Sequence, residues 1–294
     1  MGLAVIGAGR WGSALHFAFS KSSTCKITSR HKRDVEDFVS TEEALACNYL
    51  VFAIPAQVVG RWLKENFIFK NQKVLVVAKG IEKDSGKFLN EVFSQYIPEE
   101  NLAFLSGPSF ASEVSKSLPT AVVINSKSEK LSLEFSNFFP DFMKTYISDD
   151  VIGAEICGAY KNVVAIASGI CTGLKLGNNA RASLMARGLV EMSRFGTYFG
   201  AQDETFLGLS GAGDLFLTAS SELSRNFRVG LALAEGKKLD KILEDLGEVA
   251  EGVFTTDAVL TLSQKEGIYT PIASEVQNIL QGKNPRESLR DLLK

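Results

Sequence analysis

The chain has 294 residues, more than one average domain, and 45% of them are hydrophobic, so it can bury a large core. Its 32 Lys and Arg nearly balance its 34 Asp and Glu, which gives a formal net charge of -2 at pH 7. This balance excludes a general electrostatic attraction to nucleic acid or anionic lipid. We therefore expect two domains and small-molecule chemistry.

Cysteine and histidine positions argue against a metal site. The four cysteines form no CxxC pair, and the two histidines lie outside metal-ligand spacing. Cys157 and Cys171 would lie about 21 Å apart on one helix, too far to bridge. We predict reduced thiols in a cytoplasmic protein without a metal. The N-terminus lacks the pattern of a signal peptide, and Lys161 interrupts the best candidate for a membrane span.

The first half alternates β-branched runs with amphipathic segments, which is typical of βαβ units and a mostly parallel sheet. Strands are expected in seven short apolar runs, at 3–7, 25–29, 49–55, 73–79, 101–107, 120–126 and 142–148. Helices are expected in the amphipathic segments between them, at 13–20, 41–46, 57–66, 86–97 and 129–139. Continuous apolar runs such as "VLVVA" suit strands that are covered on both faces.

After residue 148 the pattern becomes helical. Ser148 or Asp149 can cap the first of these helices, and four glycines are placed like helix ends, namely Gly173, Gly200, Gly236 and Gly282. We expect a Rossmann-like α/β domain with a mostly parallel sheet over 1–148 and an all-helical substrate-binding and catalytic domain over 149–294. Because no Ser- or Pro-rich linker separates them, we expect a packed interface with a cleft.

The segment "VIGAGRWGSAL" places Gly7, Gly9 and Gly12 as GxGxxG between a strand and a helix. Gly7 allows the tight turn, Gly9 allows a pyrophosphate to approach, and Gly12 lets the helix pack on the strand. The helix N-terminus then offers N–H groups to the phosphates. The pattern predicts a dinucleotide site, in which Arg10 and Trp11 are also counted, although Trp11 is expected mainly to pack.

A basic turn follows the second predicted strand. An NAD-selective site usually offers Asp or Glu to the ribose 2′-hydroxyl there, but this chain has Ser29 followed by Arg30, His31, Lys32 and Arg33. A guanidinium at this place favours a 2′-phosphate, so NADP is the preferred cofactor and NAD the second choice. The alternative is an exposed basic turn without a ligand.

The apolar helix predicted around 155–170 contains Lys161 and Asn162 in its middle. A charge buried without a partner costs several kcal/mol, so the lysine must be paired, solvated or chemically employed. A lysine that reaches the surface is the simplest alternative. We expect its ammonium to face the interdomain cleft with Asn162 and Asp214 as partners, so that Lys161→Ala keeps the fold.

Six strings occur in a fixed order along nearly the whole chain: "AKGIE" at 78–82, "SGPSFASEV" at 106–114, "GAYKNVVAIASG" at 158–169, "GLSGAGDLFLT" at 208–218, "SRN" at 224–226 and "VAEGV" at 249–253. Together they resemble the NAD(P)-dependent glycerol-3-phosphate dehydrogenase family of bacterial type. The chain departs from that family at Arg10, where serine is more usual, and in a shorter segment after the second strand.

The resemblance implies roles for individual residues. Lys161 matches the catalytic lysine, with Asn162, Asp214 and Thr218 around the reacting carbon. The positions that match substrate contacts are Lys79, Gly107, Ser109, Ser224, Arg225 and Asn226. The positions that match cofactor contacts, beyond the glycine-rich turn, are Arg30, His31, Lys79, Ala111, Arg225, Val249 and Glu251. Asp214, Ser224 and Glu251 also have a simpler interpretation as residues that begin helices.

The implied activity is reversible reduction of dihydroxyacetone phosphate to glycerol 3-phosphate, which feeds phospholipid synthesis. Lys161 would exchange the proton if neighbouring groups bring its pKa toward neutrality, and Arg225 would hold the phosphate. Two alternatives are a dehydrogenase for another 2-hydroxy or phosphorylated substrate and a non-enzymatic NADP-binding sensor. We also expect a homodimer, because the helical half has more apolar face than one layer can cover.

Overall fold

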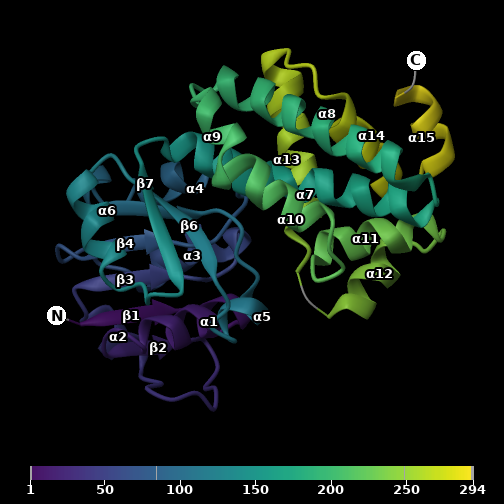
Figure 1. The fold of residues 1–294 in the computed structure, drawn as a ribbon. Coiled ribbons are helices and arrows are strands. Elements are labelled where there is room, and N and C mark those ends of the chain that lie inside the picture. The colour runs from purple at the N-terminus through teal and green to yellow at the C-terminus, as the bar shows by residue number, and fades with distance from the viewer. Residues whose placement is uncertain (1, 84, 248, 293–294) are drawn as a thin grey trace. The chain divides into compact units, whose positions relative to one another are not determined.

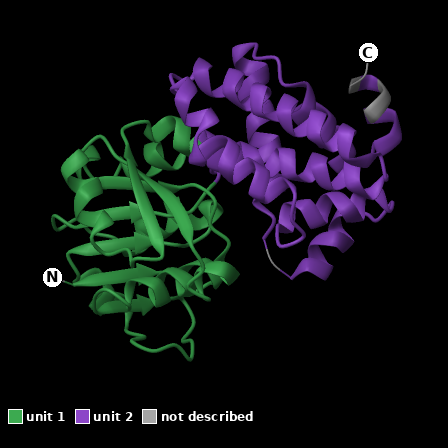
Figure 2. Cartoon of the chain, viewed as in Figure 1, with its two compact units in different colours: residues 1–79, 87–155 green, residues 80–86, 156–294 purple. Residues whose placement is uncertain are grey.

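The computed structural model describes residues 2–83, 85–247 and 249–292. The chain forms two compact units, shown in different colours in Figure 2. Unit 1 consists of residues up to 79 and residues 87–155, and unit 2 consists of residues 80–86 and 156–294. The division therefore falls inside a helix, a few residues after the predicted boundary at 148, and the short segment 80–86 belongs to the helical unit.

Within the described residues, unit 1 is built on a seven-stranded sheet with the order β2-β1-β3-β4-β5-β6-β7 (Figure 1). The strands are β1 Leu3–Ile6, β2 Cys25–Thr28, β3 Tyr49–Phe52, β4 Lys73–Val76, β5 Leu102–Ser106, β6 Thr120–Asn125 and β7 Met143–Ser148. Neighbouring strands are parallel except β5 and β6, which are antiparallel. The predicted strands and the mostly parallel sheet are confirmed.

Helices cover both faces of the central strands, which is why β1 and β3 are continuous apolar runs with every residue buried. The edge strand β7 is mostly accessible to solvent. One core cluster joins β1 and β2 to α1 (Arg10–Phe19), α5 (Ala111–Val114) and α6 (Glu129–Ser136). The second joins β1, β3 and β4 to α2 (Thr41–Leu45), α3 (Ala56–Asn66) and α4 (Leu89–Phe93), and a 3₁₀ turn, η1 (Glu99–Asn101), precedes β5. Helix α4 is shorter than the helix predicted over 86–97.

The strand order gives unit 1 a topological switch point. From β1 the chain passes through α1 to β2 on one side, whereas β3 lies on the other side of β1. In open α/β sheets the loops diverge at such a point, beyond the carboxyl ends of the strands, and ligands bind there. The glycine-rich turn lies at this place, directly after β1.

Unit 2 is helical. Its helices are α7 Val151–Gly173, α8 Gly177–Tyr198, α9 Asp203–Leu207, a π-helical turn η2 Leu209–Gly213, α10 Asp214–Ala219, α11 Arg225–Ala234, α12 Leu239–Leu246, α13 Glu251–Glu266, α14 Pro271–Leu280 and α15 Pro285–Leu292 (Figure 1). The first five residues of α7 belong to unit 1. The predicted helix ends at Gly173, Gly200, Gly236 and Gly282 agree with these bounds within two residues.

Helix α7 is long and apolar enough to cross a membrane, but 94% of its most apolar 18-residue window is buried inside the protein. It is therefore a core helix of this fold. Its cap is Asp150, whose Oδ1 accepts a hydrogen bond from the Gly153 N–H at 2.9 Å. The predicted cap at Ser148 or Asp149 is wrong, because the Ser148 hydroxyl instead accepts from the N–H of Asp150.

Helices α7 and α11 cross at backbone contact. A Cβ atom added to Gly169 would collide with the carbonyl oxygen of Phe227, and one added to Gly230 would collide with that of Ile166. Two facing glycines thus let the helices approach more closely than side chains would permit. The crossing fixes the start of α11, which carries Arg225 and Asn226, against the helix that carries Lys161 and Asn162.

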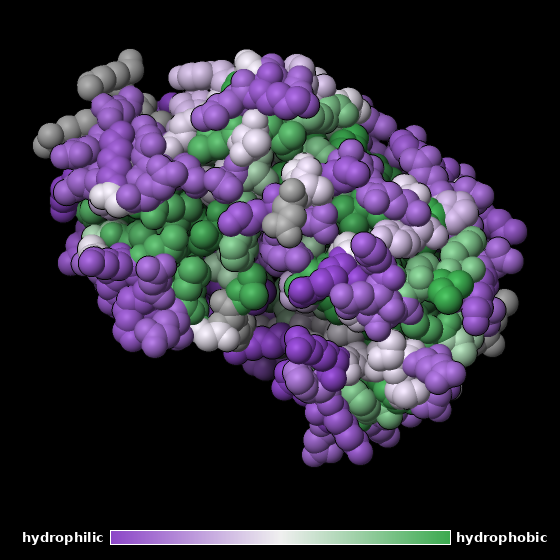
Figure 3. All heavy atoms as spheres, turned by 180° about the vertical axis from the view of Figure 1, so that it is seen from behind, coloured by the Kyte–Doolittle hydropathy of each residue, from purple (hydrophilic) through white to green (hydrophobic). Residues whose placement is uncertain are grey.

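The surface in Figure 3 is mostly hydrophilic, with apolar areas scattered between charged side chains. Among the residues whose burial is described, the most exposed large apolar ones are Ile68, Leu207 and Tyr269. The four cysteines are buried thiols. Burial raises the pKa of the Cys25 thiol to about 12, so this thiol is inert at neutral pH.

Candidate active site

The glycine-rich turn of unit 1 leaves room beside the backbone at the start of α1. Gly7 has a φ of +116°, a conformation that L side chains rarely adopt, and its N–H donates to the Thr28 carbonyl at 2.8 Å. A Cβ on Gly12 would collide with the Gly7 carbonyl oxygen, whereas one on Gly9 would meet no atom within 4 Å in the described part of the chain. Gly9 is the N-cap residue of α1 and has no side chain with which to cap it.

This arrangement fits a dinucleotide. The first turn of a helix presents N–H groups that lack intrahelical acceptors, and the helix dipole makes that end attractive to phosphate. The open space at Gly9 is where a pyrophosphate needs to come close to the backbone. Trp11 is partly buried against the core of unit 1, in agreement with a packing role.

The basic turn after β2 is exposed. Arg30, His31, Lys32 and Arg33 are all solvent-accessible, and the turn is held by the Ser29 hydroxyl, which donates to the His31 carbonyl at 2.7 Å. An open hollow follows, lined by Lys32, Arg33, Asp34, Val35, Asp37 and Phe38. The hollow therefore combines two cations with two carboxylates, a juxtaposition that the sequence pattern did not indicate.

A second group of predicted residues follows the ends of β4 and β5 in unit 1. The Lys79 ammonium donates to the carbonyl of Gly107 at 3.3 Å, and the Ser109 hydroxyl donates to the same carbonyl at 3.2 Å. Gly107 directly follows β5, and Ala111 begins α5. Because parallel strands end at one edge of a sheet, Lys79, Gly107 and Ser109 lie together.

In unit 2, Lys161 is paired. Its side chain lies on α7, and the residue is 8% exposed. The ammonium donates to Asp214 Oδ1 at 2.5 Å and to Thr218 Oγ1 at 3.1 Å. Asp214 is the first residue of α10 and Thr218 lies one turn later, so both face the same point. With Asp214 only 1% exposed, the ion pair is buried, which explains how an apolar helix accommodates the lysine.

Asn162, which follows Lys161 in the sequence, belongs to a chain of hydrogen bonds that joins α7, α11 and α13. The Gly252 N–H donates to Asn226 Oδ1 at 2.9 Å, and Asn226 Nδ2 donates to Asn162 Oδ1 at 2.9 Å. Asn162 Nδ2 in turn donates to the Gly158 carbonyl at 3.2 Å. Asn162 thus bonds to Asn226, a partner that the sequence analysis did not give it.

The residues around Asn226 also begin helices. The Ser224 hydroxyl caps α11 by accepting from the Phe227 N–H at 3.3 Å, while Arg225 is the first residue of that helix and is exposed. Val249 precedes α13, and Glu251 is its first residue. The simpler interpretations of Ser224 and Glu251 as helix-start residues therefore hold, and they are compatible with ligand contacts at the same positions.

Comparison with known proteins identifies the family. Residues 31–132 match the model for the N-terminus of NAD-dependent glycerol-3-phosphate dehydrogenase, and residues 150–290 match the model for its C-terminus. The chain is 62% identical, over 293 residues, to a glycerol-3-phosphate dehydrogenase of a Nitratiruptor species, covering 100% of this chain and 98% of the relative. The chain belongs to the NAD-dependent glycerol-3-phosphate dehydrogenase family.

Further relatives agree. The chain is 63% identical over 289 residues to the NAD(P)+-dependent glycerol-3-phosphate dehydrogenase of Sulfurimonas denitrificans, covering 98% of each protein. The crystal structure of glycerol-3-phosphate dehydrogenase from Coxiella burnetii superposes with a TM-score of 0.91 at 33% identity, covering 99% of this chain and 98% of that chain. The resemblance inferred from the six sequence strings is thus confirmed.

Sequence analysis missed a second buried polar group in this dehydrogenase. Glu191 of α8 accepts hydrogen bonds from the Tyr160 hydroxyl at 2.8 Å and from the N–H groups of Ile272 and Ala273 at 2.8 and 2.9 Å. Burial raises the pKa of Glu191 despite these donors. The carboxyl ties α7, α8 and the start of α14 together, and a lone glutamate in a helical segment gives no sequence signal of that role.

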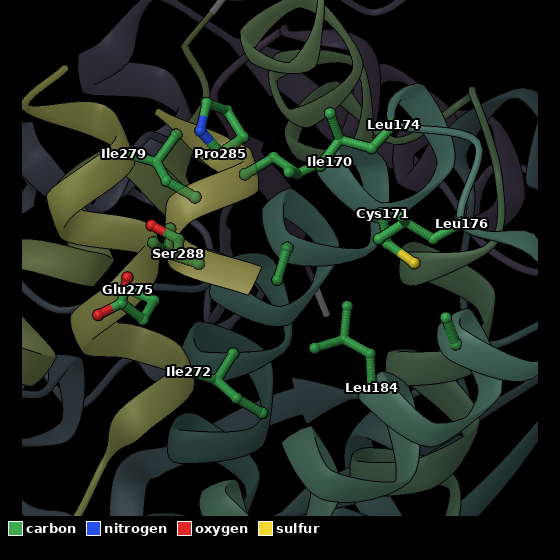
Figure 4. Close-up of a pocket in the computed structure, with 13 residues that line it drawn as sticks. Ile170, Cys171, Leu174, Leu176, Leu184, Ile272, Glu275, Ile279, Pro285 and Ser288 are labelled. Carbon is green, nitrogen blue, oxygen red and sulfur yellow. The ribbon is translucent and has the colours of Figure 1, made fainter. Parts of the chain in front are cut away.

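Unit 2 also contains an apolar cavity of about 80 Å³. Figure 4 shows aliphatic side chains of α7, α8 and α14 around it, among them Ile170, Leu184 and Ile279, with Pro285 and Ser288 of α15. Among the described residues, its lining includes none of the predicted site residues. A cavity of this character has no cation to bind a phosphate and lies outside the candidate active site.

Proposed function

We propose that this chain, a glycerol-3-phosphate dehydrogenase that uses NAD(P)+, reduces dihydroxyacetone phosphate with Lys161 as general acid. The supporting observation is the buried ammonium, held by hydrogen bonds to Asp214 and Thr218. A positioned ammonium donates a proton to the ketone oxygen during reduction and accepts it back during oxidation of glycerol 3-phosphate. Asp214 and Thr218 fix the ammonium, and Asp214 compensates its charge.

The carboxamides supply hydrogen-bond donors to the substrate. Each carboxamide nitrogen carries two hydrogens, and the bonds described for Asn162 and Asn226 use one on each. The remaining hydrogens suit the hydroxyl and phosphate oxygens of the substrate. This assignment rests on the position of Asn162 beside Lys161 and of Asn226 beside Arg225.

The phosphate is bound at the start of α11. Arg225 offers two parallel N–H groups to phosphate oxygens, and the N-terminus of this ten-residue helix contributes its dipole. Ser224 and Asn226 flank the arginine. Lys79, Gly107 and Ser109 of unit 1 complete the set of proposed substrate-binding residues.

The residues that match cofactor contacts in the family would hold the dinucleotide. The turn from Gly7 to Gly12, with Arg10 and Trp11, would bind the pyrophosphate, and Arg30 with His31 would bind the adenosine side. Further contacts are assigned to Lys79, Ala111, Arg225, Val249 and Glu251. When bound, the nicotinamide supplies the hydride to the carbonyl carbon. Space at Gly9 and the uncapped start of α1 support this fit.

NADP is the proposed preferred cofactor. The exposed Arg30 follows β2, where the ribose of a bound dinucleotide is expected, and a guanidinium there stabilises a 2′-phosphate. Arg30→Asp should therefore reverse or abolish the preference, measured as the ratio of kcat/KM with NADPH to that with NADH. Equal values for the two cofactors in the unmodified protein would refute the preference.

The activity is tested by following NADPH oxidation at neutral pH with and without dihydroxyacetone phosphate. We expect turnover only with the substrate, and no turnover with either cofactor would refute the proposal. A sensor would bind NADPH without turnover, and the alternative dehydrogenase would prefer another substrate.

We further propose a cytoplasmic homodimer that supplies glycerol 3-phosphate for phospholipid synthesis. A monomer mass in light scattering would refute the dimer.

A further inference from the structure

We propose that Gly252 is a positioning residue, whose N–H and lack of a side chain orient the carboxamides of Asn226 and Asn162 so that both present N–H donors. The inference rests on the proposed function, in which these carboxamides contact the substrate. Gly252 is the second residue of α13, between Glu251 and the rest of the helix.

The direction of the hydrogen bonds starts at Gly252. A backbone N–H can only donate, so the atom of Asn226 that faces it must be the oxygen Oδ1, at 2.9 Å. Asn226 Nδ2 then faces Asn162 Oδ1, also at 2.9 Å, and Asn162 Nδ2 faces the Gly158 carbonyl. One backbone donor and one backbone acceptor thus fix the orientation of two side chains between them.

The opposite orientation is unfavourable at both ends. If the Asn226 carboxamide rotated by half a turn, its nitrogen would face the Gly252 N–H and its oxygen would face Asn162. Asn162 would then have to rotate as well, which would place its oxygen against the Gly158 carbonyl. Each contact would leave a buried polar group unsatisfied, at a cost of about 1–3 kcal/mol per group. The Gly252 N–H therefore selects the observed state.

A side chain at position 252 would disrupt this arrangement. A Cβ atom there would lie 2.7 Å from Asn226 Oδ1, 2.8 Å from the backbone oxygen of Asn162 and 3.0 Å from Ile166 Cδ1. The oxygen of Asn162 belongs to the middle of α7 and cannot move alone. The start of α13 would have to withdraw from α7, and the hydrogen bond to Asn226 would lengthen.

The bond also satisfies a group that the helix leaves without a partner. The first N–H groups of an α-helix have no intrahelical acceptor, and the N-cap residue of α13 is Ala250, which has no polar side chain. Asn226 accepts from this first turn across a sequence separation of 26 residues. The substrate-side carboxamides and the segment 249–251, assigned to the cofactor, are consequently held by one contact.

The hydrogen bond is tested directly by amide exchange in the full chain, measured by NMR. In Asn226→Ala we expect the Gly252 N–H to exchange at least about tenfold faster than in the unmodified protein. The matched control is Gly153, another glycine in a first helical turn, whose N–H donates to the Asp150 side chain at 2.9 Å and should be unaffected. Unchanged exchange at Gly252 would overturn the proposal.

The role in positioning is tested by kinetics. Gly252→Ala should lower kcat/KM for dihydroxyacetone phosphate by roughly 10- to 100-fold, as expected when groups that orient a substrate are displaced. The control is Gly188→Ala, whose Cβ would lie 2.6 Å from Val164 of the same helix α7 and which should lower Tm without this loss. Equal losses in the two variants, or no loss in Gly252→Ala, would show that Gly252 only packs.

A double-mutant cycle separates action through Asn226 from a general shift of α13. In the Asn226→Ala background, Gly252→Ala should lower kcat/KM by no more than about twofold further, because the group that it displaces is absent. The same fold-loss in both backgrounds would overturn the proposal. If the unmodified protein fails to turn over dihydroxyacetone phosphate, the proposed function fails, whereas the exchange result still decides whether Gly252 holds Asn226.

Discussion

The glycine-rich turn of unit 1 and the polar set of unit 2 prepare for ligands in opposite ways. The turn depends on the lack of side chains: Gly9 leaves space beside the backbone, and Gly12 permits close contact with the Gly7 carbonyl. The polar set depends on particular side chains: Lys161, Asp214 and Thr218 are each at most 8% exposed and are hydrogen-bonded to one another. A pyrophosphate is recognised by backbone groups, whereas a proton transfer needs side chains held in place.

This difference determines how each region tolerates change. The backbone turn stores no buried charge, so its variants should lose ligand binding for steric reasons. In the polar set each group compensates another, so removing one leaves its partner unsatisfied in the interior. Variants of Lys161, Asp214 or Thr218 should therefore lose stability together with activity.

Lys161→Ala should have the largest effect. Turnover of dihydroxyacetone phosphate should fall by about 100-fold or more, because a positioned general acid is lost. The variant should also lose about 3–5 kcal/mol of unfolding free energy, since Asp214, whose side chain is 2% exposed, would be left as an unpaired buried charge. Turnover and urea unfolding, measured on one preparation, test both parts.

A matched control is Lys73→Ala. Lys73 also pairs with a carboxylate, that of Glu134, but its side chain is 32% exposed, and it lies in unit 1 away from the assigned residues. Its loss should change turnover little and stability by about 1 kcal/mol or less.

The burial of Asp214 revises the expectation that Lys161→Ala would keep its stability. A fully stable but inactive Lys161→Ala would restore it and contradict the comparison.

Arg225→Ala should come next. Loss of a bidentate contact to phosphate costs roughly 1.5–3 kcal/mol, which corresponds to about a 10- to 150-fold rise in KM for dihydroxyacetone phosphate. Because Arg225 is exposed at the start of α11, Tm should change little, unlike in Lys161→Ala. The KM of Arg225→Lys should lie between those of the unmodified protein and Arg225→Ala, since lysine keeps the charge but loses the bidentate contact. An unchanged KM would mean that another cation binds the phosphate.

The two regions also differ in how far the sequence could predict them. The turn is a contiguous motif between a strand and a helix, so Gly7, Gly9 and Gly12 could be placed from spacing alone. The same holds for central parallel strands such as β1 and β3, in which every residue is apolar and buried. The contacts of Lys161 cross 53 and 57 residues, and those of Asn226 cross 64 and 26, distances at which periodicity carries no information. The sequence strings shared with the family identified these residues, but they did not indicate that Asn162 forms a hydrogen bond with Asn226.

A pair of glycine variants sharpens the comparison within unit 1. Gly12→Ala would force its Cβ against the Gly7 carbonyl, so stability should fall by about 1–3 kcal/mol, as in an overpacked core. Gly9→Ala has open space and a φ of -77°, which alanine adopts readily, so Tm should stay near that of the unmodified protein. Both should bind NADPH more weakly, measured by fluorescence titration. Normal NADPH affinity in Gly9→Ala would show that the pyrophosphate does not approach there.

A third kind of buried group lies at the start of α7, and it predicts the smallest effect. Glu155 accepts hydrogen bonds from the Asn90 N–H at 3.1 and 3.0 Å. Within the described residues it forms no ion pair, in contrast to Asp214, which pairs with Lys161. Burial raises the pKa of Glu155 from 4.5 to about 8, although the backbone donors oppose this rise. The folded protein therefore holds the proton more tightly than the unfolded chain does.

The sign of the pH dependence follows. Stability from Glu155 is fully present below about pH 4.5 and is lost as the pH rises through about 8, because ionisation of the buried carboxyl then opposes folding. Glu155→Gln cannot ionise and keeps an oxygen for the Asn90 N–H, so its Tm should decline less than that of the unmodified protein between pH 5 and 8. Glu43→Gln is the control of opposite sign. Hydrogen bonds from Ser40 lower the pKa of Glu43, so its contribution to stability is lost only as the pH falls through that lowered pKa. The Tm difference between Glu43→Gln and the unmodified protein should stay constant over pH 5 to 8. Parallel Tm profiles for Glu155→Gln and the unmodified protein would mean that Glu155 is ionised throughout, and that backbone N–H groups alone can compensate a buried carboxylate as well as Lys161 does.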